Sequence, residues 1–331
     1  MLKIGINGYG RIGRNFHRLL LKNKKIKVVA INSRADAKMR AHLLKYDSLH
    51  GTLKNEIRAE KNAIFVDGER IESLSIKNPA EIPWSDFGVD IVLESTGKAK
   101  TSELAAAHLR GSVKKVLVSA PMKDKTPTFV MGVNDDHFDE NARVVSNASC
   151  TTNCISPILK VLLEHFSIEN VFVSSIHSIT NSQNLLDNSG RDLRRARSAM
   201  ENVIPTTTGS IAAIGLILPE LLGKIDGLAF RVPTPTVSIC DMRLVFAEKT
   251  TAENLNQLLR DAAKTERFKK IIEVCDEPLV SADFRSNSHS VIVDAELTKV
   301  VGGKFAQLQL WYDNEWGYAA RLIDLLEKMG D

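Results

Sequence analysis

Residues 2–13 read LKIGINGYGRIG, an alternating apolar run followed by three glycines. Residues 2–6 have the pattern of a buried strand, and Gly8, Gly10 and Gly13 then form Gly-x-Gly-x-x-Gly. Glycines at these positions permit a tight turn and let backbone N–H groups approach a pyrophosphate, which the N-terminus of a following helix favours. The stretch therefore predicts a dinucleotide site, the alternative being a glycine-rich turn without a ligand.

The residues that follow supply the rest of a βαβ unit. Apolar side chains at Phe16, Leu19 and Leu20 have helical spacing, and residues 26–31 form a second strand-like run. A glycine motif is a weak signal alone, but a strong one between two strands with a helix in register.

The end of the second strand predicts which dinucleotide binds. The residues there are Asn32-Ser33-Arg34-Ala35-Asp36, with no carboxylate directly at the strand end. A carboxylate would accept hydrogen bonds from the ribose of NAD and repel a 2′-phosphate, whereas Ser33 and Arg34 could bind that phosphate. The alternative is that Asp36 or a backbone group serves the ribose and Arg34 is only solvated.

Strands and helices continue to alternate up to residue 118. Residues 63–66 and 70–76 flank Asp67-Gly68, which predicts a hairpin. A strand at 89–94, a helix at 102–110 and a strand at 113–118 follow. This order is typical of a mostly parallel, doubly wound sheet with its ligand at the carboxyl ends of the strands. Candidate ligand-binding residues stand at four such ends: Gly8, Ser33, Thr96 and Ser119.

Composition narrows the class of protein. The 331 residues are 44% hydrophobic and 25% charged, and this length favours two domains. A formal charge of +4 permits anionic ligands without indicating nucleic acid, and no apolar run is long enough to predict a membrane span. Four cysteines form no disulfide framework, which predicts a cytoplasmic location, and residues 1–7 begin a strand-like pattern in place of a leader pattern, so we expect no signal peptide.

A second motif, Ser146–Cys154, lies between a strand-like run at 143–145 and an apolar-periodic helix. Cys150 would stand where helix N–H groups converge, and these groups favour a thiolate. The two readings are a nucleophilic cysteine and a packed, inert one. For Cys154, one turn later, we expect packing.

His177 directly follows a predicted strand at 170–176. A histidine there could pair with Cys150, giving a thiolate and an imidazolium and later acting as a general base. The other histidines have no comparable partner in sequence and are interpreted as structural: His17, His42, His50, His108, His137, His165 and His289.

Several polar groups in the second half could bind anions. The loop at 178–200 is too long and polar for a simple connection, and its arginines would either bind phosphate or form a solvated face. Residues 205–209 offer hydroxyls and free amides, and Arg231 stands between an apolar strand and a proline-rich turn. Further strands at 237–246, 291–297 and 305–312, with a helix at 251–264, predict an α+β domain with a mostly antiparallel sheet.

The chain resembles the phosphorylating glyceraldehyde-3-phosphate dehydrogenases over essentially its whole length. The resemblance rests on six blocks in the same order: residues 6–14, 45–51, 146–154, 192–195, 230–235 and 311–318. It implies a dinucleotide-binding domain at 1–148, with a C-terminal helix at 315–331 packing back on it, and a catalytic domain at 149–314.

The resemblance also implies roles for individual residues. Cys150 would form a thiohemiacetal and then a thioester with the aldehyde, and His177 would be the base. Inorganic phosphate would bind at Ser149, Thr151, Arg195, Thr208 and Gly209, and the substrate's own phosphate at Thr180 and Arg231. The cofactor, NAD or NADP, would contact Gly8, Gly10, Arg11, Ile12, Gly13, Ser33, Arg34, Lys77, Thr96, Ser119, Ser189 and Asn314, with Asn314 on the nicotinamide carboxamide. No metal is implied, and the partners are glyceraldehyde 3-phosphate, inorganic phosphate and three further copies in a homotetramer.

Departures from the family pattern bear on the cofactor. Ser33 replaces a common Asp, and Asn188-Ser189 replaces a common Leu-Pro, as in members that use NADP. We therefore predict that NADP is accepted. Ile179 and Asn184 also replace common Tyr and Lys or Arg, which removes a cation near the phosphate sites.

Two other functions compete with this prediction. Erythrose-4-phosphate dehydrogenase shares the Cys–His pair, but residues 205–209 and 230–235 here follow the triose enzyme. A nucleic-acid-binding module that has lost catalysis is disfavoured, because the sequence shows no basic stripe or aromatic stacking motif.

Overall fold

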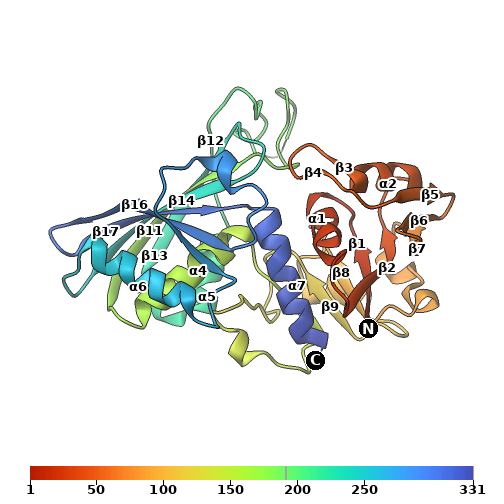
Figure 1. Ribbon diagram of the computed structural model, residues 1–331, viewed down its shortest axis with the longest axis horizontal. Coiled ribbons are helices and arrows are strands. Elements are labelled where there is room, and N and C mark those ends of the chain that lie inside the picture. The colour runs from red at the N-terminus through yellow and green to blue at the C-terminus, as the bar shows by residue number, and fades with distance from the viewer. Residues whose placement is uncertain (191, 331) are drawn as a thin grey trace. The chain divides into compact units, whose positions relative to one another are not determined.

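The computed structural model describes residues 1–190 and 192–330, and its helices and strands are labelled in Figure 1. The chain divides into two compact units. The first comprises Met1–Phe129, His137–Ala148 and the C-terminal segment from Ala319, and the second comprises Val130–Asp136 and Ser149–Tyr318. Within the described residues, no helix is both long and apolar enough to cross a membrane.

The first unit contains an eight-stranded sheet in the order β10-β9-β8-β1-β2-β7-β6-β5. Every neighbouring pair from β10 to β7 is parallel, and β6 and β5 add antiparallel strands at one edge. The doubly wound sheet predicted from the sequence is confirmed. The strands are β1 (Leu2–Asn7), β2 (Ile26–Asn32), β5 (Ile57–Glu60), β6 (Ala63–Val66), β7 (Glu69–Leu74), β8 (Ile91–Glu94), β9 (Lys115–Val118) and β10 (Val144–Ser146).

Helices and shorter elements complete this unit: α1 (Arg11–Leu20), α2 (Ala37–Lys45), α3 (Ser102–Ala106), the strand pair β3 (Tyr46–Asp47) and β4 (Gly51–Thr52), and the 3₁₀ turns Pro79–Glu81, Trp84–Phe87 and Asp135–His137, the last shared with the second unit. The hairpin predicted at Asp67-Gly68 is present, since Val66 pairs with Glu69 and both turn residues have positive φ. The predicted helix at 102–110 is shorter. The helix ends at Ala106, and the following residues form a turn in which His108 is buried.

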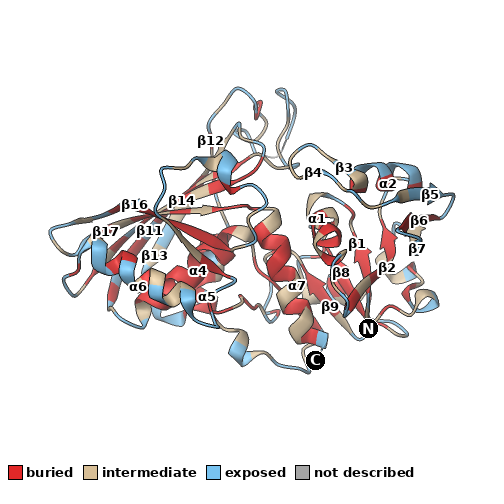
Figure 2. Cartoon of the chain, in the orientation of Figure 1, coloured by how far each residue is buried: buried red, intermediate tan, exposed pale blue. Residues whose placement is uncertain are grey.

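The second unit contains a seven-stranded, mostly antiparallel sheet in the order β12-β13-β11-β14-β17-β16-β15. Helices α4, α5 and α6 contact this sheet (Figure 1), and its alternate side chains are buried (Figure 2). The elements are α4 (Cys150–Leu163), β11 (Ile168–Ser178), β12 (Ile204–Thr206), α5 (Ser210–Ile217), the 3₁₀ turn Pro219–Leu221, β13 (Ile225–Val232), β14 (Ser238–Phe246), α6 (Ala252–Lys264), β15 (Ile272–Cys275), the 3₁₀ turn Ser281–Phe284, β16 (Val291–Val301) and β17 (Phe305–Tyr312).

The last helix, α7 (Trp316–Gly330), runs from the second unit into the first. Two hydrogen bonds connect this helix to the first unit. Asn23 Nδ2 donates to Glu327 Oε1 at 3.1 Å, and Lys115 Nζ donates to the carbonyl of Met329 at 2.8 Å. The expected helix end at residue 331 lies outside the described residues. The domain limits 1–148 with 315–331, and 149–314, stay predictions.

Candidate functional site

The glycine turn of the first unit leaves room for a pyrophosphate. Gly8 has φ +99°, and a Cβ on it would come within 2.7 Å of the backbone of Ser95 and Thr96. A Cβ on Gly13 would come within 2.4 Å of the Gly8 carbonyl, whereas one on Gly10 would meet nothing within 4 Å. Helix α1 has no side-chain cap and no acidic residue in its first turn. Its N–H groups are therefore available to an anion, and the turn fits a dinucleotide.

Residues predicted at the strand ends come together because β9, β8, β1 and β2 are adjacent. The N–H of Gly8 donates to the Asn32 carbonyl at 2.9 Å, and that of Ser119 to the Glu94 carbonyl at 2.9 Å. The Thr96 N–H donates to Glu94 Oε1 at 2.8 Å. These loops thus form one edge of the parallel sheet, where such folds bind ligands.

Glu94 anchors a buried polar network behind this edge. Its Oε2 accepts from Asn7 Nδ2 at 2.6 Å and lies 3.1 Å from His108 Nε2. Trp84 Nε1 donates to His108 Nδ1 at 3.1 Å, which places the imidazole hydrogen on Nε2, toward the carboxylate. Burial opposes ionisation of Glu94, but hydrogen bonds from His108, Thr96 and Asn7 hold its pKa below the ordinary value. The structural role interpreted for His108 agrees with these contacts, although the sequence did not identify Glu94, 14 residues earlier, as its partner.

Arg11 and Ile12 open helix α1, as expected for pyrophosphate contacts. The Arg11 guanidinium also forms an ion pair with Asp47, whose side chain is almost fully enclosed. Burial opposes the charge of Asp47, yet Arg11 and the N–H groups of Leu49 and His50 hold its pKa well below the usual range. This pair fixes the direction of the Arg11 side chain.

The cation that contacts Ser33 is a residue that the sequence prediction did not consider. Arg34 and Lys77 are both exposed, and Asp36 caps α2 by accepting from the Met39 N–H at 2.7 Å. Instead Arg40, a buried residue of α2, donates from Nε to Ser33 Oγ at 2.9 Å. The available signal was an arginine on the apolar face of a short helix, between Ala37 and Leu44.

In the second unit, Cys150 begins helix α4, and Ser149 caps it by accepting from the Thr152 N–H at 3.0 Å. Ala148, just before the cap, has φ +54°, a conformation that costs a residue with a Cβ on the order of 1 kcal/mol. Cys150 Sγ lies 3.6 Å from His177 Nε2. The structure thus brings the two predicted catalytic residues together.

Desolvation favours the neutral form of both members of this pair. It raises the pKa of Cys150 to about 11, against the opposing charge of Arg231, and lowers the pKa of His177 to about 3. The directions of these pKa shifts favour the neutral pair over the expected thiolate–imidazolium pair, because desolvation outweighs the support that Arg231 and Thr151 give to the thiolate. A proton can still pass from Sγ to Nε2 without changing the net charge of the pair.

Three groups hold the His177 ring. Its Nδ1 lies 2.7 Å from the Ser178 carbonyl and 2.5 Å from Arg231 Nη1. The carbonyl only accepts and the guanidinium only donates, so these two contacts favour opposite tautomers; in the one that Ser178 favours, the hydrogen is on Nδ1 and Nε2 can act as the base. The buried Tyr312 ring meets the imidazole edge on, with centroids 6.0 Å apart. Sequence reasoning assigned no role to Tyr312, although it lies in the matching block 311–318, because its contacts with Thr151 and His177 form only on folding.

Two of the residues predicted to bind inorganic phosphate, Ser149 and Thr208, are linked through Ser210, and Arg195 contacts Thr207. Ser149 Oγ donates to Ser210 Oγ at 2.8 Å, and the Ser210 N–H donates to Thr208 Oγ1 at 3.2 Å. Arg195 Nη2 donates to the Thr207 carbonyl at 3.0 Å, and Gly209 precedes α5. The Thr151 side chain points elsewhere, since its buried hydroxyl bonds Tyr312 Oη at 3.0 Å.

The remaining predicted residues lie as follows. Thr180 Oγ1 donates to Gln183 Oε1 at 2.9 Å, and no hydrogen bond links it to Arg231. Asn314 is buried, and its Oδ1 accepts from Ser178 Oγ at 2.9 Å and Ser238 Oγ at 3.0 Å, so its amide N–H₂ is oriented to donate. Ser189 is exposed in the long loop. Across the described residues there is no cluster of three or more His, Cys, Asp or Glu that could hold a metal ion.

Comparisons with known proteins identify the family of this chain. Residues 149–314 match the family described as "Glyceraldehyde 3-phosphate dehydrogenase, C-terminal domain", and residues 2–102 match its NAD-binding domain. Glyceraldehyde-3-phosphate dehydrogenase 1 of Bacillus cereus is 49% identical over 330 residues, covering 99% of this chain and 98% of that protein. The dehydrogenase of Geobacillus stearothermophilus is 49% identical over 325 residues, covering 98% and 97%. The chloroplastic GAPA1 of Arabidopsis thaliana is 46% identical over 329 residues, covering 98% and 83%.

Proposed function

This chain belongs to the glyceraldehyde-3-phosphate dehydrogenase family, and we propose that Cys150 and His177 carry its reaction. The substrate is D-glyceraldehyde 3-phosphate, inorganic phosphate is the second substrate, and NAD or NADP is reduced. The product is 1,3-bisphosphoglycerate. The observation that carries the proposal is the 3.6 Å separation between Cys150 Sγ and His177 Nε2.

The first step joins the nucleophile to the aldehyde. Cys150 Sγ attacks the carbonyl carbon while its proton passes to His177 Nε2, and a thiohemiacetal forms. The Cys150 N–H, at the start of α4, and the new imidazolium stabilise the oxyanion, and the imidazolium then returns its proton to that oxygen, which leaves Nε2 unprotonated for the next step. Because the proton moves from Sγ to Nε2 within the pair, this step creates no net charge in the buried site.

The second step oxidises the thiohemiacetal. His177 Nε2 removes the hydroxyl proton as the C–H hydrogen leaves with its electron pair. The nicotinamide ring supplies the acceptor for that hydride when the cofactor is bound. The remaining thioester loses its bond to Sγ when a phosphate oxygen attacks the acyl carbon, and the thiol is restored by a proton from His177.

Two anion sites would position the phosphates. The first site lies at the N-termini of α4 and α5, which are linked by hydrogen bonds. Ser149, Thr208 and Arg195 would bind inorganic phosphate there, together with the Gly209 N–H and the backbone of Thr151. Thr180 and Arg231 suit the substrate's own phosphate. A phosphate there would draw the Arg231 guanidinium from His177 Nδ1, which removes a charge that opposes the imidazolium.

The cofactor would lie on the glycine turn of the first unit, at Gly8, Gly10, Arg11, Ile12 and Gly13. Thr96 and Ser119 complete the sheet edge. Asn314, whose amide is oriented by two serines, would hold the nicotinamide carboxamide. Ser33 lacks the carboxylate that would repel a 2′-phosphate, so NADP is accepted; kinetics showing more than about a hundredfold preference for NAD would contradict this.

The test measures reduced cofactor formed from the aldehyde, with and without inorganic phosphate. Cys150→Ser should abolish turnover and retain cofactor binding measured by titration calorimetry. Loss of cofactor binding in this variant would show that the site is misplaced. Erythrose 4-phosphate serves as the competing substrate, and a higher kcat/KM with it would support the alternative enzyme, which the names of the relatives do not favour.

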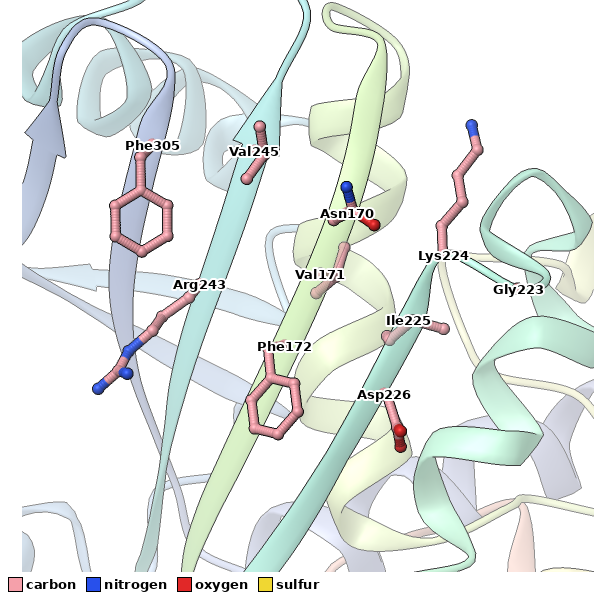
Figure 3. A pocket seen from close by; sticks show the side chains of 10 residues that line it. All are labelled: Asn170, Val171, Phe172, Gly223, Lys224, Ile225, Asp226, Arg243, Val245 and Phe305. Atoms are coloured by element: carbon pink, nitrogen blue, oxygen red, sulfur yellow. The ribbon is translucent and has the colours of Figure 1, made fainter.

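A homotetramer is supported by an exposed sheet face in the second unit. The strands β13, β11, β14 and β17 carry a groove lined by Phe172, Val245, Arg243 and Phe305 (Figure 3), and both phenylalanine side chains are exposed. Helices contact this sheet, whose buried side chains alternate with these exposed ones. Light scattering measures the molar mass of wild type and of Phe172→Asp. The variant should form an assembly of fewer subunits, and an unchanged mass would show that this face is not a subunit interface.

A further inference from the structure

Arg40 is a buried cation whose hydrogen-bond partners are all neutral. Its Nε donates to Ser33 Oγ at 2.9 Å, and its Nη2 donates to the Ser33 carbonyl at 2.8 Å. Further bonds go to Ser73 Oγ and the Leu74 carbonyl, at the end of β7. No carboxylate in the described part of the chain forms an ion pair with Arg40.

A buried charge normally has an opposite charge nearby, because desolvation costs several kcal/mol per ion, on the order of the whole stability of a domain. Burial lowers the pKa of Arg40 to about 10, so the guanidinium remains charged at neutral pH. Arg40 therefore places a positive charge near the carboxyl end of β2; the charge of Asp36 acts on it, but the two side chains form no ion pair.

Ser33 connects this charge to the edge of the sheet. A hydroxyl has one hydrogen and two acceptor positions, and one acceptor position of Ser33 Oγ is taken by Arg40. Its hydrogen remains available to donate, and the charged donor behind it strengthens that donation. The side chain is half-buried at the strand end where the ribose of a dinucleotide lies in this fold.

We propose that Arg40 is a positioning residue that makes this strand end select a cofactor with a 2′-phosphate, by polarising Ser33 and supplying the charge that the phosphate needs. The proposal deepens the proposed function and rests on it for the identity of the cofactor. Arg34 contributes less, because an exposed guanidinium is screened by solvent and salt.

The test compares two small probes, adenosine 2′,5′-bisphosphate and adenosine 5′-monophosphate, by titration calorimetry on the full-length protein. Wild type should bind the bisphosphate more tightly. Arg40→Met should reduce the ratio of the two affinities about tenfold, or about 1.4 kcal/mol. Arg40→Lys, which keeps the charge, should retain most of the ratio. Lys38→Met removes an exposed cation from the same helix and should leave the ratio within about twofold.

Taking the ratio within each variant cancels any loss of folded protein. The proposal is overturned if Arg40→Met leaves the ratio within twofold of wild type, if both affinities fall together, or if Lys38→Met lowers the ratio equally. The kinetic counterpart is the ratio of kcat/KM for NADP and NAD, which should fall in parallel. Absence of phosphate-dependent aldehyde oxidation in wild type would instead contradict the proposed function, and the binding ratio would still report on Arg40.

Discussion

His108 in the first unit and His177 in the second are both buried imidazoles, but only one has a full set of conventional partners. Both ring nitrogens of His108 are bonded, to Trp84 and Glu94 at 3.1 Å each, and all three side chains are enclosed. His177 has a carbonyl and a guanidinium competing for Nδ1, and a thiol 3.6 Å from Nε2. A saturated histidine stabilises the fold, whereas one with an incompletely used nitrogen can move a proton.

Of the changes that compare the two histidines, His177→Asn is expected to have the largest effect, and that effect is on the rate. The amide cannot accept the Sγ proton, so kcat/KM should fall about 10³-fold, or about 4 kcal/mol in activation free energy. Steady-state kinetics measures the loss. The free energy of unfolding should fall little, and a rate within tenfold of wild type would remove His177 from its role as base.

The converse result is expected for His108→Leu. Trp84 Nε1 would lose its acceptor and Glu94 one of its donors, so the free energy of unfolding should fall by about 2–3 kcal/mol. The kcat per folded molecule should stay within about twofold of wild type. Urea denaturation and active-site titration separate the two effects, and a large loss of kcat with unchanged stability would reverse the comparison.

The pH dependence of the free energy of unfolding gives a further test of His177, because protonation of this residue is linked to unfolding. The pKa of His177 is about 3 in the folded protein, below its ordinary value of 6.5, so the unfolded chain binds a proton that the folded protein does not. Stability is therefore retained above pH 6.5 and lost as the pH falls toward 3. The slope from this site is about 1.4 kcal/mol per pH unit.

Denaturation curves at pH 7, 6, 5 and 4 measure this slope, and His177→Asn should make it shallower by that amount. His17, whose pKa burial also lowers to about 3, contributes in the same window and remains in the variant. An unchanged slope in His177→Asn would show that the imidazole is not buried in its neutral form.

The smallest effect is expected at a third buried histidine. Tyr9 Oη lies 2.6 Å from His17 Nδ1, and both side chains are buried. Tyr9→Phe removes the hydroxyl and keeps the ring, so we expect a loss of about 1 kcal/mol in the free energy of unfolding. Thermal unfolding detects it, and full retention of stability would mean that a water molecule replaces the hydroxyl.

Much of the fold and of the site could be predicted because the signals are local. The alternation in β1, the glycines beside it and the helical spacing in α1 lie within 20 residues. The positions of Cys150 at a helix start and His177 near a strand end followed from the same patterns. The shorter α3 could not be predicted, since His108 leaves the helical course to reach partners in the core.

The hydrogen-bond partners of buried polar side chains, and their charge states, could be identified only from the tertiary structure. Arg34 stands beside Ser33 in sequence, but Arg40 contacts it, because α2 turns its buried face toward β2 and β7. Asn7 and Glu94 are 87 residues apart and meet only when β1 and β8 pair.

The sequence by itself determined the order of strands and helices, the glycine turn and the residue types of a Cys–His site, since each depends on neighbouring residues and backbone geometry. Only the tertiary structure decided that Cys150 and His177 are neutral, that His108 is saturated and that Arg40 lies behind Ser33. The physical reason is that pKa values and hydrogen-bond partners depend on burial and on groups brought together by folding.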